Sequence, residues 1–266
     1  MNNYYEELIS YKKDEIKDFF KNAKLFDSQF KYDSFNETCN QKMFIENNQT
    51  EIKTVKNLKE EISELKDTCK ACGTYFMNPR NKSIKGLDVQ LGRFLEKCLM
   101  DYMNDKLNLK AMPADNKNKS YPDCMVLDGS RGIIAYFEVK YHGAPFISAI
   151  QSIKRFCYEG SATLDYKKVI KQLELIDSDL DRPTFYIHWI DYPCLKGIFF
   201  ETSEQVKNNI YKDGPEFDRK EREGDYKTIH KIGYTEKIYS PLLEMGTFEE
   251  FIDILKDLKK NGVIQQ

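Results

Sequence analysis

The chain has 266 residues, of which 41% are hydrophobic and 32% are charged, and its formal net charge is −2. This length and hydrophobic content predict one large domain, or a core with a smaller module. The charge excludes the strongly basic balance typical of constitutive nucleic-acid binders, although basic residues can still cluster on one face. No stretch approaches 18 apolar residues, no secretion signal begins the chain, and seven cysteines are scattered, so we expect a cytoplasmic protein without a membrane span.

The N-terminal region, residues 1–78, is expected to be helical and polar. Two amphipathic patterns at helical spacing support this expectation: Tyr5, Leu8, Ile9, Ile16, Phe19 and Phe20, and then Ile52, Val55, Leu58, Ile62 and Leu65. A loop at Asn78–Asn81 is a plausible boundary to a second region, residues 79–266. The first region either covers the core or forms a dimer face, or it is a module that recognises DNA.

A Cys-x2-Cys pair, Cys69 and Cys72, is half of a zinc site. A structural zinc ion needs four ligands, and no second pair of that spacing exists. Cys39 and His142 are distant in sequence and have no suitable local spacing. We therefore expect ordinary thiols and no structural zinc.

A helix is predicted next, from its apolar residues at helical spacing: Ile84, Leu87, Leu91, Phe94, Leu95, Cys98 and Tyr102. Glu96 lies at the flank of this apolar stripe, one turn after Gly92, and Asp88 lies at a similar boundary. Each acid is a candidate for a polar site at the edge of the helix.

A strand, a turn and a strand follow. Cys124–Leu127 is apolar, 128–132 has turn chemistry, and 133–140 is rich in aromatic and β-branched residues. In such a hairpin, residues whose numbers sum to about 261 face each other, which places Asp123 opposite Glu138. Strand alternation puts Lys140 on the same face as Glu138. Two acids and one amine are thus expected to converge.

This set of side chains has a defined chemistry. Mg2+ prefers oxygen ligands, and it commonly uses one or two carboxylates together with water and substrate phosphate. A bound Mg2+ polarises a phosphate and lowers the pKa of a bound water. A lysine beside it can position that water or stabilise negative charge. The pattern predicts metal-dependent phosphodiester hydrolysis.

Further elements are predicted after this hairpin: a helix over Leu164–Ile176, strands over Thr184–Ile190 and Leu195–Phe200, and a final helix with Thr247 and Glu250 as its capping box. Residues 211–240 are a charged segment, in which 226–232 and 234–239 could form a hairpin around Gly233. This segment is either a solvated loop or a ribbon that contacts DNA, with Lys227 and Lys231 as candidate contacts.

Pro122-Asp123 and Glu138-Val139-Lys140 resemble the signature of the PD-(D/E)xK nuclease superfamily, which includes the type II restriction endonucleases. The resemblance covers about Lys82 to Glu201. It implies an α/β restriction-endonuclease-like core, a central mixed β-sheet flanked by α-helices, here with a helical N-terminal extension. It also implies that Asp123, Glu138 and the Val139 carbonyl hold one or two Mg2+ ions, while Lys140 handles the attacking water.

The resemblance also suggests roles for Glu96 and Gln172, and strand alternation suggests one for His142. Glu96 resembles the additional glutamate that family members carry on an upstream helix, where it binds a second metal or orients the first. Gln172 resembles a glutamine that some members place on the helix after the third strand. Gln172 and His142, which lies on the face of Lys140, are candidate DNA contacts.

The function expected from this resemblance is Mg2+-dependent cleavage of double-stranded DNA by a sequence-specific type II restriction enzyme. Such an enzyme is expected to be a homodimer and to act beside a DNA methyltransferase of the same system. Two alternatives remain open: a repair, phage or anti-phage nuclease without strict sequence specificity, and a non-catalytic DNA-binding protein of the same fold.

Overall fold

The computed structural model describes residues 3–22, 37–41, 60–61, 63, 87–114, 117–143, 161–192, 195–213, 217–220 and 234–261. The helices among them are α1 (Tyr4–Asn22), α2 (Glu37–Asn40), α6 (Leu87–Lys106), α8 (Tyr166–Leu175), α9 (Ser203–Asp213) and α10 (Phe248–Asn261). The strands are β1 (Lys110–Pro113), β2 (Cys124–Leu127), β3 (Ile133–His142), β4 (Ser161–Asp165), β5 (Thr184–Asp191), β6 (Lys196–Thr202), β7 (Phe217–Lys220), β8 (Tyr234–Pro241) and β9 (Gly246–Thr247). A π-helical turn, η4 (Ile176–Leu180), extends α8, and a 3-10 turn, η5 (Leu242–Glu244), follows β8.

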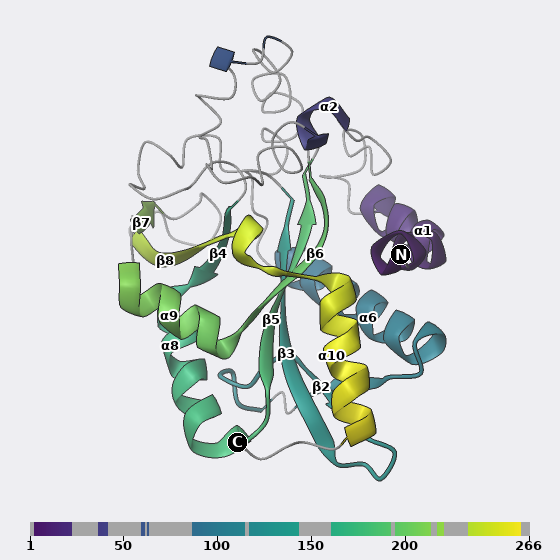
Figure 1. Ribbon diagram of the computed structural model, residues 1–266. Coiled ribbons are helices and arrows are strands. Elements are labelled where there is room, and N and C mark those ends of the chain that lie inside the picture. The colour runs from purple at the N-terminus through teal and green to yellow at the C-terminus, as the bar shows by residue number, and fades with distance from the viewer. Residues whose placement is uncertain are drawn as a thin grey trace.

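A six-stranded mixed sheet, in the order β1-β2-β3-β5-β6-β9, forms the centre of the molecule. The β3 and β5 pair is parallel, and the other neighbours are antiparallel. A second sheet has the order β4-β8-β7. Helices α6 and α10 lie on one side of the central sheet, and α8 and α9 lie on the other (Figure 1). The predicted mixed sheet with flanking helices is confirmed.

The two faces of the central sheet differ in chemistry. Strand alternation directs Phe137, Ile187 and Phe200 into the main hydrophobic core, where side chains of α1, α6 and α10 pack against them. The opposite face carries Glu138 and His188, which are buried although they are polar. Buried polar groups are stable only with hydrogen-bonding partners, so this second face must be built around specific contacts.

Helix α1 packs into the same core as the sheet. Its residues Leu8, Ile16 and Phe20 are buried there, and they share the core with α6 and α10. The three positions recur at helical spacing and form the apolar stripe that covers the neighbouring elements. The separate region that the sequence suggests for residues 1–78 therefore begins with a helix that completes the core.

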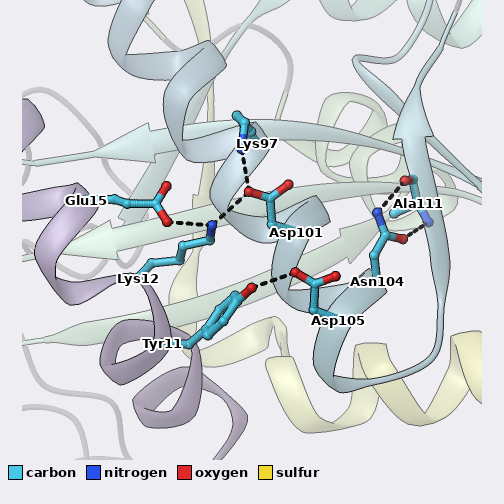
Figure 2. Close-up of polar contacts among 8 residues, drawn as sticks. All are labelled: Tyr11, Lys12, Glu15, Lys97, Asp101, Asn104, Asp105 and Ala111. Carbon is cyan, nitrogen blue, oxygen red and sulfur yellow. Dashed lines mark hydrogen bonds and ion pairs between the residues drawn. The ribbon is translucent and has the colours of Figure 1, made fainter.

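A buried lysine joins α1 to α6. The ammonium group of Lys12 lies 2.8 Å from Asp101 and 2.9 Å from Glu15, and its side chain is only 5% exposed (Figure 2). The hydroxyl of Tyr11 donates to Asp105 at 2.5 Å on the same side of α6. A buried ammonium group is tolerated because carboxylates compensate it, so these contacts fix where α1 lies on α6.

Several predicted elements are confirmed. Strands β5 and β6 cover the two segments predicted as strands, and α6 covers the predicted helix from Leu87 onward. Before α10, the Thr247 hydroxyl accepts from the backbone N–H of Glu250 at 3.3 Å, while the Glu250 carboxylate accepts from the Thr247 N–H at 2.7 Å. This reciprocal pair is the predicted capping box.

One prediction about local structure needs correction, and another is only partly tested. The helix predicted from Leu164 begins at Tyr166, because Leu164 belongs to β4 and pairs with Ile238 of β8. Strand β8 forms where the hairpin was predicted, but its described partners are β4 and β7. Its predicted partner, residues 226–232, lies outside the described residues, as do Lys227, Lys231, Cys69 and Cys72.

Candidate nuclease site

The site forms where β2 begins beside β3. Cys124 pairs with Phe137 and Met125 with Tyr136, so the register follows the sum of 261 that the sequence predicts. Asp123 directly precedes β2 and therefore lies opposite Glu138 at the end of the strand pair. The turn between the strands is held by the Asp128 carboxylate, which accepts from the backbone N–H groups of Ser130 and Gly132 at 2.8 and 2.7 Å.

Asp123 is held by the strand opposite. Its Oδ2 accepts a hydrogen bond from the backbone N–H of Val139 at 3.1 Å. Burial first, and then the negative charges of Glu138 and Glu96, raise the pKa of the Asp123 carboxyl to about 7, although Lys140 and Lys168 act in the opposite direction. A positive charge placed next to Asp123 would therefore be strongly favoured, because it would offset this crowding of negative charge.

Glu138 is almost completely buried and is surrounded by donors. Its Oε1 lies 2.8 Å from the ammonium group of Lys140 and also contacts the ammonium group of Lys168. Its Oε2 accepts from the Gln172 amide at 3.2 Å. Burial opposes ionisation, but the two lysines outweigh it and lower the pKa of Glu138 to about 2. Glu138 is thus a permanent anion at neutral pH.

Glu96 belongs to the same electrostatic cluster. It is half-buried on α6. Its pKa is raised by burial first and by the charge of Glu138 second, while Lys140 and Lys168 act in the opposite direction. The predicted helix-borne acid is therefore near the two strand-borne acids. The side chain of its rival, Asp88, lies outside the described residues.

The donor set fits a hard divalent cation. Asp123 and Glu138 face each other with the backbone of Val139 beside them, and the mutual repulsion of the acids is what a cation would relieve. No group of three or more His, Cys, Asp or Glu side chains able to hold a metal occurs in the part of the chain that the structure describes. A metal here would use two carboxylates and a backbone carbonyl, with water and phosphate completing its ligands, which is the pattern of Mg2+ rather than of zinc.

His142 lies behind Lys140, in a buried chain of polar groups. Its Nε2 is 3.1 Å from Nδ1 of His188, whose Nε2 is 2.8 Å from Oε1 of Glu201. The other Glu201 oxygen accepts from Asn209 at 3.0 Å. Burial, together with His188 and Lys140, holds the pKa of His142 well below its usual range, so the ring is neutral.

Two residues proposed from sequence as DNA contacts are enclosed by protein. His142 is 9% exposed and Gln172 is 1% exposed. Their described contacts are to His188 and Glu138, so both residues support the site from within rather than presenting a surface to DNA. The physical reason is that His142 lies against His188 of β5, while α8 packs over Tyr186 on the same face of the sheet. Neither contact could be read from the periodicity of β3 alone.

Lys168 is the site residue that sequence reasoning missed. It lies on α8 four residues before Gln172, so helical geometry puts both side chains on one face. This spacing within the predicted helix was the available signal.

Two buried polar atoms near Glu138, Gln172 Oε1 and the Tyr186 hydroxyl, have no hydrogen-bond partner among the described residues.

Comparisons with known proteins give limited similarities. No protein-family model matches the chain, and no curated protein gives a significant match. The solved structure of Hjc, a Holliday junction resolvase from Archaeoglobus fulgidus, aligns with a TM-score of 0.35 and 12% identity over 61% of this chain and 96% of its own. D212, a nuclease from a fusselovirus, aligns with a TM-score of 0.36 and 16% identity over 65% of this chain and 91% of its own. Since both TM-scores are below 0.5, we base the function on the side chains of the site. Among the described helices, none has the length and apolar character needed to cross a membrane.

Proposed function

We propose that the protein is a metal-dependent nuclease that hydrolyses DNA phosphodiester bonds. One observation carries the proposal: Asp123 and Glu138 face each other where β2 begins beside β3, and Lys140 lies 2.8 Å from Glu138. Two carboxylates and an amine at one strand end are the groups that phosphodiester hydrolysis with a hard cation requires.

Each residue has a distinct role in this proposal. Asp123, Glu138 and the Val139 carbonyl would hold Mg2+, which when bound polarises the phosphate and acidifies water. Lys140 orients the attacking water and offsets the negative charge that develops on the phosphate. Gln172 keeps Glu138 in its orientation through the contact to Oε2. Glu96 supplies further negative charge at the edge of the site, where it orients the first cation or takes a second.

The finer assignment is a type II restriction endonuclease. The basis is the family resemblance of the Pro-Asp and Glu-Val-Lys segments. Such an enzyme cuts both strands of a palindromic site, which favours a homodimer with two-fold symmetry. It also requires a cognate methyltransferase that protects the host DNA.

Digestion of a long DNA of defined sequence with Mg2+ tests the proposal. Discrete fragments would support a restriction enzyme, and a smear would support a nuclease without strict specificity. Wild-type protein that cleaves no DNA with Mg2+ or Mn2+ would overturn the nuclease assignment. Lys140→Ala, purified in parallel, is the control for contaminating nucleases, because it should be inactive in either case.

A further inference from the structure

Two ammonium groups share one oxygen of Glu138. Lys140 reaches Oε1 from the same strand, and Lys168 reaches it from α8. The two lysine side chains are 28% and 35% exposed, whereas the Glu138 side chain is 1% exposed. The carboxylate is therefore enclosed by protein, while both lysine side chains remain partly exposed.

A divalent cation cannot bind Oε1 of Glu138 in this arrangement without moving an amine. Mg2+ binds a carboxylate oxygen at about 2.1 Å, inside the space that an ion-paired ammonium group occupies. A like charge within a few ångströms also repels the cation. Metal binding through Oε1 of Glu138 thus requires at least one of the two lysines to leave that oxygen.

Lys168 is the amine with freedom to leave. Lys140 is two residues from Glu138 on the central strand β3, so its backbone is fixed beside the site. Lys168 lies in the first turn of α8, on an element separate from β3, and its side chain is the more exposed of the two. A lysine has a flexible four-carbon stem and acts as a mobile point charge.

We propose that Lys168 occupies the cation position on Glu138 in the free protein and moves to a DNA phosphate when a metal binds. This inference rests on the proposed nuclease function, because the group that the displaced Lys168 amine contacts is a DNA phosphodiester next to the one that is cleaved. Lys168 is then a positioning residue in the free protein, where its ion pair holds the Glu138 carboxylate in place, and a DNA-contacting residue in the complex.

Metal binding without DNA tests the first half of the proposal, the displacement of Lys168 from Glu138. Mn2+ is titrated into wild type and Lys168→Met at pH 8, and binding is followed by calorimetry or by electron paramagnetic resonance. Removing a competing positive charge should tighten Mn2+ binding at least about threefold. Lys171→Met, which removes an exposed lysine from the same helix, should leave the affinity unchanged.

The sign of this effect separates the proposal from a purely structural role. If Lys168 only ordered Glu138, its removal would weaken Mn2+ binding, so a weaker or equal affinity in Lys168→Met overturns the inference. Lys168→Gln provides a second neutral variant should the first fold poorly, and circular dichroism checks both. Wild type that binds no Mn2+ also overturns the inference.

The salt dependence of DNA binding tests the second half of the proposal, the contact of Lys168 with a DNA phosphate. A fluorescent duplex is titrated with each protein in Ca2+ and, separately, in EDTA, at several salt concentrations. Loss of one phosphate contact reduces, by about 1, the magnitude of the slope of the logarithm of the DNA association constant against the logarithm of the salt concentration. Lys168→Met should show this reduction in Ca2+ and not in EDTA, whereas Lys171→Met should match wild type in both.

The outcomes also separate the inference from the proposed function. Wild type that binds Mn2+ but cleaves no DNA would overturn the nuclease assignment, while tighter Mn2+ binding by Lys168→Met would still support displacement at Glu138. Equal salt slopes for wild type and Lys168→Met in Ca2+ would overturn the phosphate contact.

Discussion

The backbone N–H of Val139 donates to Oδ2 of Asp123 at 3.1 Å and so ties the residue between Glu138 and Lys140 to the acid opposite. Asp123 therefore has two functions in the fold and the proposed chemistry. It fixes the end of β3 through a neutral donor, and it brings negative charge next to a second acid. Substitutions can separate the two, because asparagine retains an acceptor oxygen and loses the charge.

Lys140→Ala should abolish DNA cleavage while the protein stays folded and still binds DNA. The lysine is partly exposed and contacts the buried Glu138, so its removal affects the proposed chemistry and little of the hydrophobic core. Cleavage of a long DNA and binding of a duplex in Ca2+ are measured side by side. Turnover like that of wild type in the folded variant would remove the main argument for this site.

Asp123→Asn should stabilise the metal-free protein at pH 8 by about 1–3 kcal/mol relative to wild type. Burial and the neighbouring Glu138 and Glu96 raise the pKa of Asp123 to about 7, so its ionised form is unfavourable in the folded state. Thermal unfolding in EDTA measures the difference.

The pH dependence of that difference follows from the direction of the shift. An aspartate in an unfolded chain has a pKa of about 3.9. Between that value and about 7, folded wild type binds more protons than unfolded wild type, so its stability falls as pH rises. The advantage of Asp123→Asn should thus grow from pH 5 to pH 8 and then level off. An advantage that shrinks over this range would contradict the assigned direction.

The extent to which the sequence predicts this site depends on the kind of contact. The opposition of Asp123 and Glu138 follows from hairpin register, which is local, and the structure has the same register. The contact of Lys168 with Glu138 joins β3 to α8 across a crossover that includes β4, so it depends on how the helix packs. The burial of His142 likewise depends on β5 and β6, which supply His188 and Glu201. Periodicity specifies which residues share a face, and packing decides which of those faces are covered.

Glu96→Gln should reduce cleavage less than Glu138→Gln does. Glu96 is half-buried on α6 and acts on the site through its charge, whereas Glu138 is the buried acid that both lysines contact. Initial rates of cleavage over a range of Mg2+ concentrations compare the two variants. If Glu96→Gln were the more damaging substitution, the metal position would have to shift toward α6.

Lys12→Met should lower the free energy of unfolding by about 1–3 kcal/mol, because it leaves Asp101 without one of its two ammonium partners. The other partner, Lys97, remains 2.5 Å from Asp101, which limits the loss. Urea unfolding measures the change, and Lys13→Met, at an exposed position of the same helix, is the control. Equal stabilities of Lys12→Met and wild type would argue that the contact of Lys12 with Asp101 does not hold α1 on α6.

The protein should act as a homodimer, at least on DNA. A palindromic site presents two equivalent strands, and one site per chain serves both strands only if two chains are related by a two-fold axis. The buried residues of α1 are already packed against α6, α10 and the sheet, so the dimer contact has to use other surfaces. Light scattering of the protein alone and with an uncleavable duplex gives the mass in each state. A monomer in both states that still cuts both strands in one binding event would rule out this arrangement.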